Sequence, residues 1–337
     1  MQVRTILGLL FAGGAGAGIL SYAKYRREMA EIRIRIETGS TIAETAAGPI
    51  EYAEEGSGEP LLLIHGAGGG YDQGLMIGRD FTQRFRTIAP SRFGYLRTPV
   101  PGDVSPAAQA DAHAALLDSL NVDKCVVAGV SAGGPSAIEF ALRHPTRTRA
   151  LILMVPRTYD PTQSIGVDEG FQAQVVLRLI EASADFLFWL ALRVARPAVV
   201  RFLGVRPEVE ANASESERER VTEIMRSILP LSRRVSGIAV DSSIEIAPWP
   251  LEQIGVPTLI ISGPDDLFET LPGARFTAEH IPGAELKILE SGGHLMLGQG
   301  EQVRMWIEDF LARRVELAAA RPPARTKAAA RPALATA

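Results

Sequence analysis

The sequence predicts an α/β protein with a mostly parallel central sheet, and three observations lead to this fold class. Short apolar runs bounded by glycine and proline recur along the middle of the chain, as expected of buried parallel strands. Amphipathic helical segments separate these runs, which is the pattern of crossover connections. The chain has 337 residues, of which 46% are hydrophobic and 22% charged. This composition is typical of a folded globular protein, and the length leaves room for an insertion or appendages.

The strands are predicted from apolar runs four to six residues long. The parallel strands are expected at residues 60–65, 87–90, 125–130, 150–155, 257–262 and 285–289. Before them, residues 32–36 and 49–53 alternate or pair like an antiparallel hairpin. We therefore expect a short antiparallel start to an otherwise parallel sheet.

Helices are predicted between the strands. Residues 106–120 place one apolar face on Ala110, Ala114, Leu117 and Leu120. A second helix is expected over residues 135–143. From about residue 157 to residue 245 the sequence is helix-like and has no buried-strand signal. This block is interpreted as a helical cap inserted into the sheet.

The two ends of the chain differ from its middle. Residues 5–23 carry no charge and would span roughly 28 Å as a helix, which predicts an N-terminal membrane anchor. A cleaved signal peptide is the alternative, because Ser21-Tyr22-Ala23 resembles a cleavage site. Basic residues follow the segment at Lys24, Arg26, Arg27, Arg33 and Arg35, and only Arg4 precedes it. This bias favours a cytoplasmic main domain, with export as the alternative if the segment is cleaved.

These signals divide the chain into six parts. The expected division is an anchor at 1–23, a linker with the first strand at 24–47, core at 48–156, cap at 157–245, core at 246–316 and a disordered basic tail at 317–337. The tail is rich in alanine, proline and arginine and cannot bury an apolar face.

Charge and cysteine content exclude several classes of protein. The 35 basic and 39 acidic residues leave a net charge of -4, which argues against a nucleic-acid partner. The single cysteine, Cys125, cannot form an intrachain disulfide or a cysteine-based metal site. We expect neither a cofactor nor a metal.

The strongest chemical signal is Gly129-Val130-Ser131-Ala132-Gly133, which follows one predicted strand and precedes a helix. This context is typical of a nucleophile elbow, in which a tight turn exposes the serine hydroxyl. The glycines on either side of Ser131 would keep side chains from colliding with the turn. Ser131 is therefore the candidate nucleophile.

A nucleophilic serine needs a histidine base, and the histidine needs a carboxylate to fix its tautomer. His294 lies on a glycine-containing loop just past the last predicted strand, near the carboxyl edge of the sheet. The positions of His113, His144 and His280, within or at the ends of helices, indicate structural roles. The loop after the preceding strand offers two candidate acids, Asp265 and Asp266.

The order Ser131, aspartate, His294, together with the His65-Gly66 turn after an early strand, resembles the α/β-hydrolase superfamily over residues 49–316. The resemblance implies that the acid stands fourth in the loop that begins at Gly263, which selects Asp266 over Asp265. Asp160 is the remaining alternative, because some members place the acid after the strand at 150–155.

The same resemblance implies an oxyanion hole formed by the backbone N–H groups of Ala67 and Ala132, with Gly68 as the alternative to Ala67. His65 is expected to brace its loop. A serine at the elbow disfavours the dehalogenases and epoxide hydrolases of the superfamily, which use aspartate there.

The expected activity is hydrolysis of a carboxylic ester through an acyl-enzyme. Apolar cap residues such as Phe186, Phe188 and Trp189 favour a lipophilic substrate. The alternatives are a carbon–carbon bond hydrolase, a haloperoxidase or perhydrolase, and a non-catalytic binding protein of the same fold.

Overall fold

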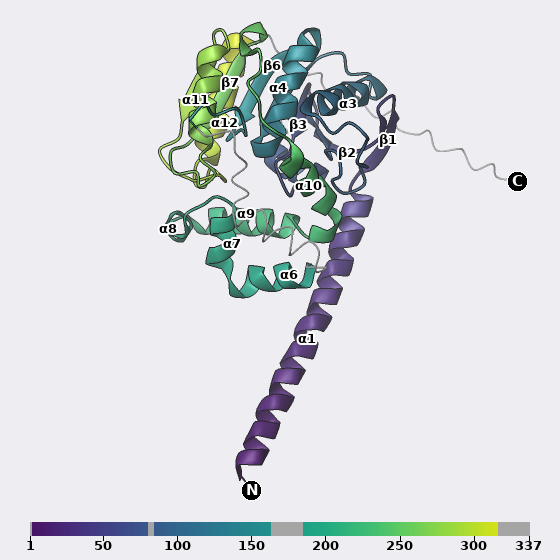
Figure 1. The fold of residues 1–337 in the computed structure, drawn as a ribbon, viewed down its shortest axis with the longest axis vertical. Coiled ribbons are helices and arrows are strands. Elements are labelled where there is room, and N and C mark those ends of the chain that lie inside the picture. The colour runs from purple at the N-terminus through teal and green to yellow at the C-terminus, as the bar shows by residue number, and fades with distance from the viewer. Residues whose placement is uncertain (1, 80–83, 163–184, 316–337) are drawn as a thin grey trace, which may run out of the picture.

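A mixed sheet lies at the centre of the molecule, and helices pack on both of its faces (Figure 1). The computed structural model describes residues 2–79, 84–162 and 185–315, with side chains from residue 20 onward. Within these residues the sheet has eight strands in the order β1-β2-β4-β3-β5-β6-β7-β8. The strands are β1 Thr41–Thr45, β2 Gly48–Gly56, β3 Glu59–Ile64, β4 Phe85–Pro90, β5 Cys125–Val130, β6 Thr148–Met154, β7 Thr258–Ser262 and β8 Glu285–Ile288.

The first two strands are antiparallel to their neighbours, and the others run parallel. Because β4 lies on the outer side of β3, the strand that follows, β5, pairs with β3 and lies near the middle of the parallel part of the sheet. Ligands of open α/β sheets bind beyond the carboxyl ends of such strands. The loops that follow β3, β5, β7 and β8 therefore share one edge of the sheet.

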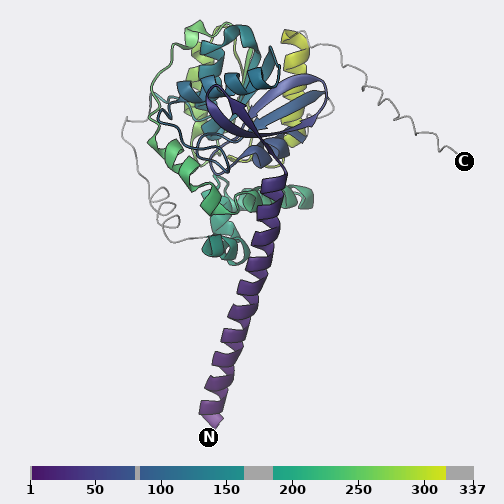
Figure 2. The same cartoon turned by 90° about the vertical axis from the view of Figure 1, so that its right-hand side faces the viewer.

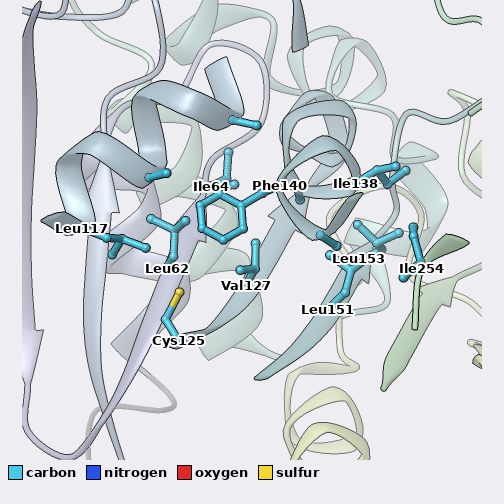
Figure 3. Close-up of a cluster of buried hydrophobic side chains, with 14 of the residues drawn as sticks. Leu62, Ile64, Leu117, Cys125, Val127, Ile138, Phe140, Leu151, Leu153 and Ile254 are labelled. Carbon is cyan, nitrogen blue, oxygen red and sulfur yellow. The ribbon is translucent and has the colours of Figure 1, made fainter. Parts of the chain in front are cut away.

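The central strands β3, β5, β6 and β7 are largely apolar on both faces because helices cover both faces. Leu62 and Ile64 of β3 belong to one buried cluster, whereas Leu61 and Leu63 belong to the cluster on the opposite face. Figure 3 shows the first cluster, in which strand side chains meet Phe140 and neighbours from the covering helices. Continuous apolar runs, in place of alternation, made these strands recognisable in the sequence.

The helices predicted at residues 106–120 and 135–143 are present as α3 and α4, and further helices are found in the core and the cap. In chain order the helices are α1 Gln2–Thr38, α2 Tyr71–Gly78, α3 Pro106–Ser119, α4 Gly134–Arg143, α6 Asp185–Val194, α7 Arg196–Phe202, α8 Pro207–Ala211, α9 Glu215–Ser227, α10 Val235–Ser243, α11 Thr270–His280 and α12 Gly300–Arg314. The side chain of Ser105 accepts a hydrogen bond from the Ala108 N–H and caps α3, with Pro106 at its first turn.

The helices α6 to α10 lie between β6 and β7 in sequence, where the cap was predicted. They build a separate apolar cluster that includes Trp189, Val200 and Met225. Met29 of α1 joins the same cluster, and the Trp189 indole N–H donates to Glu28 at 2.8 Å. The second half of α1 is thus packed against the cap, while its first half projects from the body (Figures 1 and 2).

The first expected strand is wrong in position. Residues 32–36 belong to α1, and the strand that pairs with β2 is β1. Alternation of isoleucine and arginine suggested a strand, but Met29, Ile32 and Ile36 also form a stripe at helical spacing. Met29 and Ile36 are buried, so packing of this stripe decided for the helix.

The predicted membrane localisation is overturned. Among the described residues, no helix combines the length and the apolar character that a membrane crossing requires. From residue 20 onward, α1 carries charged side chains at Lys24, Arg26, Arg27, Glu28, Glu31, Arg33, Arg35 and Glu37. We therefore retain neither the anchor nor the cytoplasmic placement inferred from it. The side chains of residues 1–19 and the predicted tail at 317–337 lie outside the described part of the chain, as do cap residues 163–184.

Candidate active site

Ser131 follows β5 directly and occupies a strained turn. Its φ is 49°, in the left-handed region that residues with a side chain rarely adopt. A Cβ on Gly129 would lie 2.6 Å from Ala137 Cβ, and a Cβ on Gly133 would lie 2.5 Å from the carbonyl oxygen of Ile64. Neither approach is sterically possible, which explains why glycine stands on both sides of the turn.

His294 and Asp266 complete a chain of hydrogen bonds that begins at this serine. The Ser131 hydroxyl lies 2.8 Å from His294 Nε2, so that it can donate its proton to the ring. On the other side of the ring, His294 Nδ1 lies 2.8 Å from Asp266 Oδ2. Loops after β5, β7 and β8 supply these three residues, and their order in space is that of a nucleophile, a base and an orienting acid.

The two neighbouring aspartates make different contacts. Asp265 accepts hydrogen bonds from the backbone N–H groups of Gly292 at 2.9 Å and Gly293 at 3.0 Å. It thus shapes the loop that carries His294, whereas Asp266 contacts the imidazole itself. The third candidate, Asp160, accepts hydrogen bonds from Thr162 instead. This geometry favours Asp266 as the acid.

The surroundings of Asp266 keep it ionised. Burial opposes the charge, but hydrogen bonds from His294, Thr270 and the Phe268 N–H outweigh burial and lower the carboxyl pKa below its usual range. An ionised Asp266 holds the His294 proton on Nδ1 and leaves Nε2 free to accept from Ser131.

At low pH the free energy of unfolding should fall, partly because the Asp266 carboxyl becomes protonated. Because the pKa of Asp266 is lower in the folded than in the unfolded chain, its stabilising contribution is complete above the unfolded pKa of about 3.9. The contribution is lost as pH falls through the lower folded value. We expect Asp266→Asn to lessen the fall of unfolding free energy below about pH 4, as measured by urea unfolding at several pH values. An unchanged pH dependence of the unfolding free energy would contradict a lowered pKa of Asp266 in the folded chain.

The loop after β3 faces Ser131. Ala67 lines the same cavity as Ser131, and Gly66 is so close that a Cβ there would lie 3.2 Å from Ser131 Cβ. The Gly68 N–H already donates to the Tyr95 hydroxyl at 3.2 Å. This geometry favours Ala67 over Gly68 as the partner of Ala132 in an oxyanion hole.

His65 braces this loop. Its Nδ1 lies 2.7 Å from the carbonyl oxygen of Gly66, and its Nε2 accepts from the Arg92 N–H at 3.0 Å. Burial, reinforced by the Arg92 charge, holds the pKa of His65 well below its usual range, so the ring is neutral. Of the other histidines, His113 is buried in α3, His144 contacts Asp111, and His280 stacks on Phe276.

A buried polar network behind the loop was not predicted from the sequence. Arg92 makes two hydrogen bonds to Asp241 of α10, at 2.6 and 2.8 Å, and also donates to the carbonyl oxygen of Gly66. The Tyr95 hydroxyl donates to Asp241 at 2.5 Å while it accepts from Gly68. Arg234, from the end of the cap, binds the carbonyl oxygen of Gly69 and the Asp72 carboxylate. The network joins the cap to the loop beside Ser131.

A cavity of about 590 Å³ lies between the core and the cap, and Ser131 and His294 open into it. Most of its lining is apolar, and about half of the lining residues belong to the cap. The cap contributes Phe188, Ala191, Ala195, Ala198, Val199, Phe202, Leu203, Ile224, Ile228, Leu231 and Ile238. Arg220 is a charged member of the lining, and it donates to Glu217 and to the carbonyl oxygen of Leu295.

The sheet order, the strained serine after its central strand and the hydrogen-bonded histidine and aspartate define a class of protein, the hydrolases built on a doubly wound α/β sheet. The chain belongs to the alpha/beta hydrolase fold family, whose model matches residues 59–301.

Similar proteins within this family are known from both sequence and structure. The chain is 28% identical to a 2-hydroxymuconate semialdehyde hydrolase of Pseudomonas putida, over 77% of this chain and 89% of that protein. It is 25% identical to a 2-hydroxy-6-oxo-6-phenylhexa-2,4-dienoate hydrolase of Burkholderia cepacia, over 73% and 84% of the two chains. A solved alpha/beta hydrolase fold protein from Nakamurella multipartita is similar at 27% identity with a TM-score of 0.59, over 81% of this chain and 98% of that one.

Proposed function

We propose that this hydrolase is a serine enzyme that cleaves a bond next to a carbonyl group in a largely apolar substrate. The observation that carries the proposal is the hydrogen-bonded series Ser131–His294–Asp266, which opens into an apolar cavity. In this proposal Ser131 is the nucleophile, His294 the general base and acid, and Asp266 the residue that orients the imidazole. The Ala67 and Ala132 N–H groups stabilise the oxyanion.

The proposed reaction has two halves. Ser131 Oγ attacks the carbonyl carbon while His294 takes its proton, and a tetrahedral oxyanion forms. The bond to the leaving group then breaks, its electron pair goes to the leaving atom, and His294 returns the proton. Water attacks the resulting ester of Ser131 with His294 again as base, which releases a carboxylic acid and restores the serine hydroxyl.

The first candidate for the broken bond is a carbon–carbon bond beside a ketone. The support comes from similarity, since the named relatives hydrolyse 2-hydroxymuconate semialdehyde and a phenyl-substituted oxo-dienoate. A carbon leaving group must delocalise the electron pair it receives, as a conjugated dienoate can. The apolar cap side of the cavity could accommodate an aryl or alkyl acyl group, with Arg220 as a cation for an acidic end.

A carboxylic ester is the second candidate. It is favoured by the composition of the cavity, because eleven cap residues that line it are apolar and an ester of an alkyl acid needs no cationic partner. The same triad chemistry could cleave either bond. The two candidate reactions are therefore distinguished by the substrate and not by the catalytic residues.

A substrate panel decides between the two. We expect a higher kcat/KM for 2-hydroxy-6-oxo-6-phenylhexa-2,4-dienoate than for p-nitrophenyl acetate, octanoate or palmitate. Hydrolysis of the dienoate is monitored by the loss of its visible absorbance. Faster cleavage of octanoate would favour an ester of a lipophilic acid. Acetate as the best substrate would contradict the apolar-substrate proposal. Peracid formation from acetate and hydrogen peroxide tests the perhydrolase alternative, and inactivity throughout would favour a binding role.

A further inference from the structure

The turn between α7 and α8 of the cap contacts two loops of the site. They are the loop that carries Asp266, called here the acid loop, and the loop that carries His294, called the base loop; together they are the relay loops. The carbonyl oxygen of Gly204 accepts two hydrogen bonds, each of 3.1 Å. One donor is the backbone N–H of Leu267, the residue after Asp266, and the other is the backbone N–H of His294 itself. A single peptide oxygen of the cap therefore links the acid loop to the base loop.

Gly204 has no room for a side chain. Its φ is 80°, and a Cβ there would lie 2.5 Å from His294 Cβ and 2.8 Å from the ring of Phe268. That ring stands edge-on to the imidazole of His294, with centroids 4.6 Å apart. Because both neighbours belong to the relay loops, any side chain at position 204 would push His294 or Phe268 out of place.

Helix α9 holds the same base loop at two more points. Arg220 donates to the carbonyl oxygen of Leu295 at 3.0 Å, and the Gly298 N–H donates to the Glu217 carboxylate at 2.8 Å. The loop from residue 293 to residue 298 is thus bound to the cap through its backbone, in addition to its bonds with Asp265 of the core. The cap contributes to the position of the base as well as to the cavity.

We propose that Gly204 is a positioning residue, whose carbonyl oxygen sets the distance between Asp266 and His294 by holding both of their loops. The proposal rests on the roles proposed above for the triad. It implies that the cap and the relay behave as one unit, so that a displacement of the α7–α8 turn moves His294 away from Ser131.

The test is Gly204→Ala, with Gly48→Ala as the matched control. Gly48 also has a positive φ, 95°, but it is the first residue of β2, next to the β1–β2 turn, with nothing within 4 Å of a Cβ. Both variants impose the same kind of backbone strain, and only the first collides with the relay. We expect labelling of Ser131 by a fluorophosphonate probe to slow about 100-fold in Gly204→Ala, as a misplacement near 1 Å does. Gly48→Ala should label like the wild type.

Kinetics and spectroscopy separate positioning from a loss of stability. In Gly204→Ala, kcat should fall with little change in KM, and the downfield proton resonance of the His294–Asp266 hydrogen bond should disappear. Labelling at the wild-type rate would overturn the proposal for Gly204. His294→Ala in the same experiment tests the triad separately: if it labels normally, the proposed function fails whatever Gly204→Ala does.

Hydrogen exchange of the wild-type protein covers the case in which Gly204→Ala does not fold. The amide protons of Leu267 and His294 share one acceptor, so they should be protected and should exchange together. Exchange of the His294 amide at the rate of an unprotected chain would overturn the proposal.

Discussion

Replacing Ser131 by alanine is expected to lower kcat by a factor on the order of 10⁶, because the variant has no nucleophile and the base has nothing to activate. Residual hydrolysis would come from water in a cavity that still contains the oxyanion hole. The measurement is turnover of the best substrate of the panel, together with fluorophosphonate labelling.

The Ser131→Ala variant should lose activity but keep the stability of the wild type. Ser131 holds a positive φ, and alanine at the same position bears the same strain without the hydroxyl. Ser243→Ala is the matched control, since Ser243 is an exposed serine of α10 that bonds the carbonyl oxygen of Val240. It should keep wild-type activity. Turnover by folded Ser131→Ala near the wild-type rate would refute the assignment of the nucleophile.

Removal of the Asp241 carboxylate is expected to destabilise the fold by about 3–5 kcal/mol. The side chains of Arg92 and Asp241 are 5% and 8% exposed, so Asp241→Ala would leave a guanidinium buried without its partner. Burial alone would lower the pKa of Arg92, but the Asp241 carboxylate outweighs it and raises that pKa. The charge therefore persists in the folded state and needs its counterion. Urea unfolding measures the loss.

Glu31→Ala supplies the comparison for Asp241→Ala. The Arg27–Glu31 pair on α1 is 84% and 63% exposed, and its removal should cost about 0.5 kcal/mol or less. A similar small cost for Asp241→Ala would show that the Arg92 charge finds water or another partner. Activity should also fall in Asp241→Ala, because Tyr95 and Arg92 hold Gly68 and Gly66 of the loop after β3, which is proposed to carry part of the oxyanion hole.

Local chemistry could be predicted from local sequence. The strand β5 coincides with the apolar run at residues 125–130, because a strand buried on both faces must be apolar throughout. Ser131 was recognisable because its turn needs glycine two residues before and two residues after it. These glycines are visible in the local sequence. His294 could be chosen from five histidines because its loop follows the last strand.

Other features depend on residues far apart in the chain. Arg92 and Asp241 are 149 residues apart, and no spacing rule joins them. Asp265 and Asp266 are chemically identical neighbours, and only the direction of each side chain from its loop separates the residue that contacts His294 from the one that contacts Gly292. The alternating pattern at residues 32–36 suited both a strand and a helix, and burial of Ile36 against the body decided for the helix.

The amino-acid sequence determined the fold class and predicted Ser131 as the nucleophile, together with the pair of loops that could supply the base and the acid. Each depends on short-range periodicity or on a turn that tolerates few residue types. The family resemblance favoured Asp266 and Ala67, but only the tertiary structure shows that Asp266 faces the imidazole and that the Gly68 N–H is already bonded to Tyr95. It alone shows that a cap carbonyl bonds both relay loops. These are contacts between segments brought together by packing, and packing is a property of the whole folded chain.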